Sequence, residues 1–229
     1  MPLPLSYWFQ FKKLRIFLAW FGGILLFLGS RMNGTSFKIG LPFLIAGELI
    51  RIGSLGFLER RGKKLTSSGP FAYVRHPLYI GNFFIGLGIV LLANQPWLLG
   101  IFLAGFFILY AGTVRKEEKD LSQKFGNDYL SYRKAVPSFI PRLTSYSAAG
   151  ENSFQWNRLL QYREYITLVG HGLLLTGLYL FQEVVRQRKF FAKEKLALAA
   201  GGVMILYLAG EWVFREWKKR SMSVRAASC

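Results

Sequence analysis

The chain has little cysteine and few acidic residues. Cys229 is its only cysteine among 229 residues, so no disulfide can form within the chain. Only 12 Asp and Glu accompany 30 Lys and Arg, which gives a formal net charge of +18. Such a charge can indicate nucleic-acid binding, but the sequence has no zinc-finger, helix-turn-helix or aromatic-basic sheet motif. We therefore expect no nucleic-acid partner.

Long apolar runs are the main feature that is present. Hydrophobic residues make up 52% of the chain and aromatic residues 17%. They fall in blocks of bilayer-spanning length rather than in alternation with polar residues. The sequence thus predicts an all-α integral membrane protein, a polytopic transmembrane helical bundle, with membrane lipids around it. Four spans are expected at residues 14–29, 37–58, 77–93 and 97–114.

The charges between these spans predict their orientation. Five basic residues lie within residues 59–75, whereas the turn at residues 94–96 carries no charge. The positive-inside rule therefore places the N-terminus, residues 59–75 and everything from Arg115 onward on the cytoplasmic side.

An amphipathic pattern follows the fourth span. Its apolar residues are three and four positions apart: Leu121, Phe125, Tyr129, Tyr132 and Val136. This spacing predicts a cytoplasmic amphipathic helix or helix pair, broken near Gly126 and ended by Pro137.

The C-terminal part contains two further apolar runs, at residues 164–182 and 196–214. We predict a core at residues 1–142, a polar linker at 143–163 and a C-terminal membrane helical hairpin with a basic tail at 164–229. Residues 186–195 between the two runs carry five basic residues and one acid. This excess contradicts the charge rule if both runs span, so either residues 164–182 are interfacial or re-entrant, or the rule fails this late in the chain. We favour two spans.

Some residues within the spans predict contacts between or along helices. Glu48 and Arg51 are three positions apart and can pair on one helix face. His171 and Glu211 lie in different C-terminal runs, where a hydrogen bond between helices would satisfy both. The glycines of the third span predict close helix packing: Gly81, Gly86 and Gly88.

A polar cluster precedes the third span. Pro77 suits the first turn of a helix and biases His76 away from helical angles. Arg75 and His76 are then presented at the mouth of the span beside free backbone N–H groups, an environment that favours an anionic group. The cluster alone is equally consistent with an interfacial anchor.

Two adjacent carboxylates favour a site over an anchor. Glu117 and Glu118 extend the apolar stripe backwards from Leu121, so both side chains should point inward. Inward carboxylates need a cation or several donors to remain ionised. Arg75, His76 or a positively charged ligand could supply this, because the hairpin of the third and fourth spans returns the pair to the cluster.

Three blocks together resemble a known family. They are Gly69-Pro-Phe-x-Tyr-Val-Arg-His-Pro-x-Tyr-x-Gly81, then Glu117-Glu118, then Phe125-Gly-x-x-Tyr-x-x-Tyr-x-x-x-Val-Pro137-x-Phe-Ile-Pro141. Their order and spacing, over about residues 50–142, resemble the isoprenylcysteine carboxyl methyltransferase and phospholipid N-methyltransferase superfamily. Its members are integral membrane enzymes that use S-adenosylmethionine at the cytoplasmic side.

The resemblance implies methyl transfer from S-adenosylmethionine to a lipidic or amphiphilic acceptor, with no metal. It places these residues on the cofactor: Lys64, Leu65, Thr66, Phe71, His76, Pro77, Leu78, Tyr79 and Glu117. Our hypothesis for the catalytic residues is that Arg75, Arg115 or Glu118 orients the acceptor or takes its proton.

The sequence departs from the family at one position and leaves alternatives open. Prenylcysteine enzymes place an arginine where this chain has Thr113, and the nearest arginine, Arg115, lies two residues further on and about 200° around the helix from that position. The acceptor thus remains open among amine, carboxylate, thiol and isoprenoid groups, as does the oligomeric state. Two other functions stay possible: an NADPH-dependent membrane lipid or sterol-type reductase of related fold, and a non-enzymatic membrane scaffold.

Overall fold

The computed structural model describes residues 21–59, 64–146, 153–182, 207, 210–212 and 214. These residues form helices and loops without strands, which confirms the all-α class. Two helices are long and apolar enough to cross a membrane, α2 (Gly34–Phe57) and α4 (Pro96–Phe125), and α3 (Pro77–Ala93) is apolar but shorter. Residues 14–20 of the first predicted span and most of the run at residues 196–214 lie outside the described residues. The count of four spans and the domain boundaries stay predictions.

The ends of α2 and α3 have clear local causes. Asn33 and Ser36 form a capping box at the start of α2, in which each side chain accepts a hydrogen bond from the other residue's backbone N–H. The helix α3 begins at Pro77 and ends before Asn94, which has a left-handed conformation with φ of 55°. Its bounds are those predicted for the third span.

The helix α4 is longer than the predicted fourth span because its polar end continues the same helix into the amphipathic segment. It ends at Gly126, whose φ is 53°, and α5 (Asn127–Ala135) follows directly. Tyr129, Tyr132 and Val136 form a buried cluster, against which Leu121 and Phe125 pack. The predicted broken amphipathic helix is confirmed.

Glycines allow α2 and α3 to pack closely. A Cβ atom on Gly40 would lie 2.6 Å from the Gly88 carbonyl oxygen, and one on Gly47 would lie 2.6 Å from that of Gly81. A Cβ atom on Gly86 would meet the ring of Phe102 in α4 at 2.3 Å. The predicted role of these glycines in close packing is confirmed.

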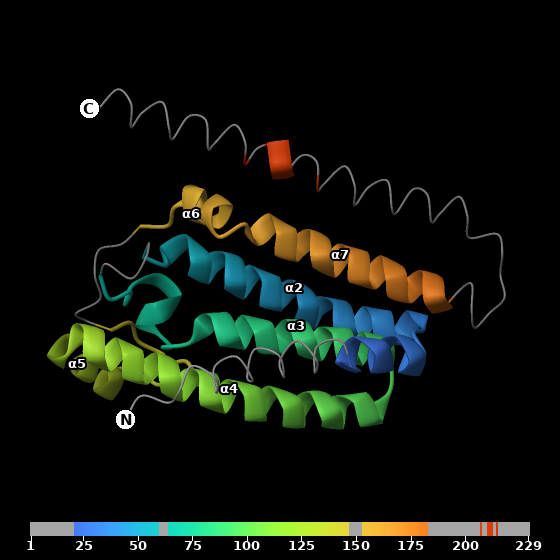
Figure 1. Ribbon diagram of the computed structural model, residues 1–229, viewed down its shortest axis with the longest axis horizontal. Helices are drawn as coiled ribbons and strands as arrows, with labels where there is room; N and C mark the ends of the chain where they lie inside the picture. Colours follow the sequence, from blue (N-terminus) through green and yellow to red (C-terminus); the bar gives the residue numbers. More distant parts are fainter. Residues whose placement is uncertain are drawn as a thin grey trace, which may run out of the picture.

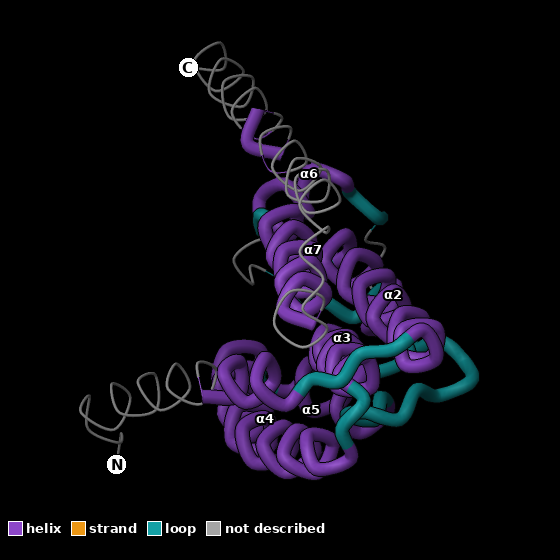
Figure 2. Tube along the Cα trace, turned by 90° about the vertical axis from the view of Figure 1, so that its right-hand side faces the viewer, coloured by secondary structure: helices purple, strands orange, loops and turns teal. Residues whose placement is uncertain are grey.

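The C-terminal segment lies along α2, on the side away from α4 (Figures 1 and 2). The structure adds a short helix, α6 (Trp156–Gln161), within the predicted linker, and α7 (Glu164–Leu180) follows it. Figure 1 shows α7, α2, α3 and α4 side by side, with α5 and α6 at the same end of the bundle.

Both expected pairs of ionisable groups within the spans are wrong. The observed ion pairs are Glu48–His171, Arg51–Glu164 and Arg163–Glu211. His171 faces α2, where it meets Glu48, and it does not meet Glu211. Glu48 and Arg51 therefore each pair with a residue of α7 instead of with one another. Sequence spacing alone does not reveal which helix lies opposite.

Candidate active site

The candidate site lies where the start of α3 meets α4 and the segment after α5. Arg75 and His76 lie between the short 3₁₀ helix η2 (Gly69–Ala72) and α3. The Arg75 N–H donates to the Pro137 carbonyl at 2.9 Å, and the His76 N–H donates to the Ser138 carbonyl at 3.2 Å. These bonds hold the segment after α5 beside the cluster.

Arg75 and Glu118 form a buried ion pair at the centre of the site. The guanidinium lies 2.6 Å from Glu118 Oε1, and the two side chains are only 9% and 13% exposed. Arg75 also donates to the hydroxyls of Tyr129, at 3.3 Å, and Ser138. Arg133 lies 3.6 Å from the other Glu118 oxygen. These contacts hold three chain segments together around the pair.

His76 is buried against the same carboxylate. Its Nε2 lies 3.3 Å from Glu118 Oε1, and its Nδ1 lies 3.8 Å from Glu117 Oε2. Burial lowers the pKa of His76 below its usual value, and the nearby Glu117 charge opposes this only in part. Near neutral pH the ring is therefore uncharged. Because ionised Glu118 can only accept, we assign the proton to Nε2, which leaves the Nδ1 lone pair facing Glu117.

The expected free N–H groups at the start of α3 are in part occupied. The backbone N–H groups of Tyr79 and Ile80 both donate to the His76 carbonyl, at 3.1 and 3.3 Å. An anionic group would have to bind at the side chains instead.

Glu117 differs from its neighbour in being accessible. Its side chain is 44% exposed, and it accepts a hydrogen bond from the Tyr79 hydroxyl at 2.7 Å. The structure thus separates the two predicted carboxylates into a buried one bound to Arg75 and an accessible one beside Tyr79. Only Glu117 offers a carboxylate to a cationic ligand without breaking a buried ion pair.

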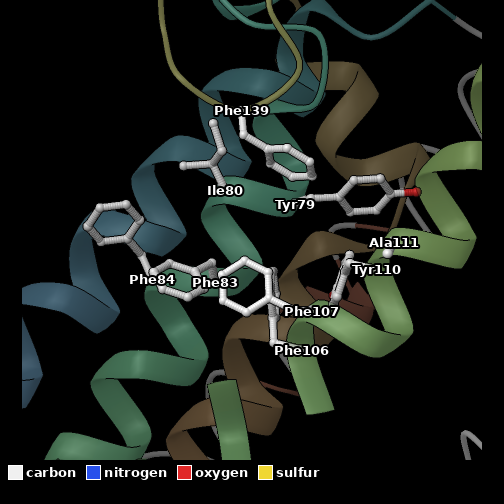
Figure 3. Close-up of a pocket in the computed structure, with 9 residues that line it drawn as sticks. All are labelled: Tyr79, Ile80, Phe83, Phe84, Phe106, Phe107, Tyr110, Ala111 and Phe139. Carbon is white, nitrogen blue, oxygen red and sulfur yellow. The ribbon is translucent and has the colours of Figure 1, made fainter. Parts of the chain in front are cut away.

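An aromatic cavity of about 310 Å³ adjoins this polar cluster between α3 and α4 (Figure 3). Its lining residues are Tyr79, Ile80, Phe83, Phe84, Phe106, Phe107, Tyr110, Ala111 and Phe139. The only polar side-chain groups among them are the hydroxyls of Tyr79 and Tyr110, whose rings meet edge to face at 4.9 Å between centroids. Tyr79 belongs to both the polar cluster and the cavity, so a ligand could contact both.

The other predicted site residues lie in different surroundings. Phe71 is buried, and its carbonyl accepts a hydrogen bond from Tyr132 at 2.7 Å. Leu65 packs on the Tyr132 cluster, and the Thr66 hydroxyl accepts from the Glu59 N–H at 3.0 Å. Pro77 is buried, Leu78 is half-buried and Lys64 is exposed.

Arg115 is not brought into the cluster. Its side chain is exposed, and no hydrogen bond or ion pair joins it to another residue in the described part of the chain. The inward register of Glu117 and Glu118 turns Arg115 to another face of α4.

Sequence reasoning missed several residues of the site. Tyr129 and Ser138 bind Arg75, Phe139 lies 5.9 Å from the His76 ring, and Tyr110 lines the cavity. Tyr129, Pro137 and Phe139 belong to the third sequence block that resembles the family. That block was the signal in the sequence that could have pointed to them as site residues. Their contacts depend on backbone pairing between distant segments, which the sequence does not show.

Comparison with known proteins relates this geometry to a family. Residues 48–123 match the isoprenylcysteine carboxyl methyltransferase family. Over this third of the chain, the sequence is similar to that family. The family segment includes Arg75, His76, Tyr79, Glu117 and Glu118, whereas α5, α6 and α7 lie beyond it.

Individual members of the superfamily are similar over part of their length. The chain is 38% identical over 115 residues to protein-S-isoprenylcysteine O-methyltransferase of Xenopus laevis, covering 45% of this chain and 40% of that protein. Identity is also 38% over 112 residues with the Schizosaccharomyces pombe protein of that name, covering 44% and 48%.

A bacterial protein matches over a longer stretch. The cobalt-zinc-cadmium resistance protein CzcN of Cupriavidus metallidurans is 29% identical over 130 residues, covering 53% of this chain and 59% of that protein. The chain spans about half the length of these curated relatives. No solved structure shows significant similarity to this chain.

Proposed function

We propose that the protein is a membrane methyltransferase that uses S-adenosylmethionine and modifies a lipidic or amphiphilic acceptor at the cytoplasmic face. The observation that carries this proposal is the accessible Glu117 carboxylate beside an aromatic cavity, on a frame fixed by the buried Arg75–Glu118 pair. The match of residues 48–123 to the isoprenylcysteine carboxyl methyltransferase family and the names of the relatives support it.

The residues of the site fit this cofactor. S-adenosylmethionine carries a sulfonium and an ammonium cation, and Glu117 offers the accessible negative charge. The rings of Tyr79 and Phe139 beside it suit a cation through their π faces. We propose that His76, Tyr79 and Glu117 hold the cofactor's polar groups. We further propose that the cofactor also contacts the residues at the edge of the cluster that the resemblance places on it: Lys64, Leu65, Thr66, Phe71, Pro77 and Leu78.

When bound, the cofactor supplies an already activated methyl group. The protein then contributes alignment, exclusion of water and electrostatics. The aromatic cavity holds the apolar part of the acceptor, and the Arg75–Glu118 pair positions His76.

The reductase alternative fits the cluster less well. The 2′-phosphate of NADPH prefers basic contacts, and Arg75 is already bound to Glu118 at 2.6 Å. The accessible group is a carboxylate, which repels a phosphate. The site therefore favours the methyl donor.

Cofactor binding tests the proposal directly. Isothermal titration of the purified full chain in detergent should show binding of S-adenosylmethionine and none of NADPH. His76→Ala and Glu117→Gln should each weaken binding about tenfold or more, since each removes a polar or charge-assisted contact. Lys119→Gln, an exposed change on the same helix, should leave binding unchanged. Undiminished binding in both site variants, or binding of NADPH alone, would refute the proposal.

A further inference from the structure

A chain of polar contacts crosses the apolar interior from α7 to the wall of the aromatic cavity. Arg51 of α2 is its centre: Nε lies 2.7 Å from Glu164 Oε1, and Nη2 donates to Oε2 at 2.9 Å. Its third nitrogen, Nη1, donates to the side-chain oxygen of Asn82 in α3. Asn82 in turn donates from Nδ2 to the Tyr110 hydroxyl of α4 at 3.0 Å.

The chemistry of these groups fixes the direction of the chain. A guanidinium has donors only, so the Asn82 oxygen must face Arg51. The amide nitrogen of Asn82 must then face α4, and the Tyr110 hydroxyl oxygen must accept from it. Glu164 is only 4% exposed and binds Arg51 through both oxygens. This fork geometry restricts the guanidinium to one orientation.

Tyr110 joins this chain to the candidate site. Its ring lines the cavity, stacks on Phe106 at 4.1 Å and meets the Tyr79 ring at 4.9 Å. The Tyr79 hydroxyl in turn binds Glu117. A rotation of Tyr110 would therefore change the cavity wall at its junction with the polar cluster (Figure 3).

We infer that Glu164, Arg51 and Asn82 are positioning residues that fix Tyr110, and that Tyr110 determines which acceptors the cavity takes. The inference rests on the proposed function. On this inference, α7 contributes to acceptor selectivity through Glu164. This helix lies outside residues 48–123, which match the family.

The chain offers a matched control in the second ion pair between α2 and α7. Glu48 and His171 also pair, but no hydrogen bond among the described residues leads from them to the cavity. His171→Asn should thus disturb the same helix interface without moving Tyr110. A comparison of His171→Asn with Glu164→Gln separates positioning from general destabilisation.

The position of Tyr110 can be tested without any activity. Full-length protein labelled with ¹³Cζ-tyrosine is studied by NMR in detergent micelles, with the Tyr110 resonance assigned by Tyr110→Phe. Glu164→Gln and Asn82→Leu should each shift the Tyr110 resonance, whereas His171→Asn should not. Asn82→Ser replaces Asn82→Leu if the latter does not fold. An unmoved resonance in the Glu164 and Asn82 variants would overturn the inference.

Selectivity is tested with geranylthiol and farnesylthiol as competing acceptors, and the methylated products are measured by mass spectrometry. Glu164→Gln and Tyr110→Phe should each change the product ratio by about threefold or more, and the double variant should change it little further, as expected for coupled residues. Additive effects, or an equal change in His171→Asn, would overturn the selectivity claim. If the wild-type protein methylates neither thiol and does not bind S-adenosylmethionine, the proposed function is refuted. The NMR experiment would still show whether Glu164, Arg51 and Asn82 fix the position of Tyr110.

Discussion

Glu117 and Glu118 are neighbours in the sequence, yet their carboxylates have different surroundings. Glu118 is buried with Arg75, Tyr129 and Ser138 around it, whereas Glu117 is accessible and binds Tyr79. Removal of a charge should therefore have different consequences at the two positions. We expect Glu118 to stabilise the fold of the site and Glu117 to bind the ligand.

Glu118→Gln should lower the free energy of unfolding by about 3 kcal/mol, because it leaves Arg75 buried without its counter-charge. Glu117→Gln should lower it by less than about 1 kcal/mol, since an accessible charge is solvated in both states. Unfolding by SDS in mixed micelles measures both values. Equal losses in the two variants would contradict the assigned roles.

The buried His76 predicts a dependence of stability on pH. Burial lowers its pKa in the folded protein, so in the unfolded chain, with a pKa of about 6.5, the ring binds more protons. The contribution of neutral His76 to the free energy of unfolding is fully present above about pH 6.5. It is lost as the pH falls toward the lowered pKa, by up to about 1.4 kcal/mol per pH unit.

The loss of stability between pH 7 and pH 5 should accordingly be smaller in His76→Gln than in wild type. Thermal unfolding in detergent at several pH values measures it. The other titratable groups are the same in both proteins, so the difference reports His76. Identical pH profiles would show that His76 has an ordinary pKa.

At the scale of elements, α2 and α3 depend on reciprocal glycine contacts. Gly47→Ala should destabilise the protein by about 1 to 3 kcal/mol, because the new methyl group would lie 2.6 Å from a backbone oxygen of α3. Gly53→Ala in the same helix, whose nearest neighbour would be 4.0 Å away, should be neutral or slightly stabilising through helix propensity. Equal effects of the two changes would argue against close packing.

The sequence predicted those elements whose ends have local causes. Pro77 and Asn94 bound α3, and Gly126 and Pro137 break and end the amphipathic segment. The predicted return of Glu117 and Glu118 to Arg75 and His76 also followed, since a hairpin returns one end beside the other. What could not be predicted was the register between helices far apart in sequence.

The pairing of α7 with α2 shows why. Glu48 and Arg51 each had a plausible neighbour within the same helix, and the sequence gives no measure of which distant helix lies against them. Likewise, the backbone bonds from Arg75 and His76 to residues 137–138 depend on tertiary contacts. Residues whose role depends on such contacts, such as Ser138 and Tyr110, were therefore missed.

For the whole molecule, polar pairs join α7 to α2 and α6 to the residues just after α2. These pairs are Glu48–His171, Arg51–Glu164 and Glu59–Arg158. Arg51 and Glu59 carry opposite charges, and Glu164 and Arg158 match them in the opposite chain order. Such a pattern favours one antiparallel register of the two segments, because a shift would oppose like charges.

The predicted orientation is testable with single cysteines, because Cys229 is the only native one. In a Cys229→Ser background, Pro96→Cys lies at the uncharged turn and Leu143→Cys lies after α5, and both positions are exposed. A membrane-impermeant maleimide should label the first in intact cells and the second only after lysis. The reverse pattern would place the candidate site on the outer face.

The central claim, methyl transfer to a lipidic acceptor, is tested most directly by mass spectrometry of lipids. Membranes containing wild-type protein or Glu117→Gln are incubated with S-adenosylmethionine carrying a deuterated methyl group, and the lipids are extracted. We predict a lipid species labelled with the deuterated methyl group in the wild-type sample, reduced about tenfold or more in the variant. Equal labelling in both samples, or none above membranes lacking the protein, would contradict the claim.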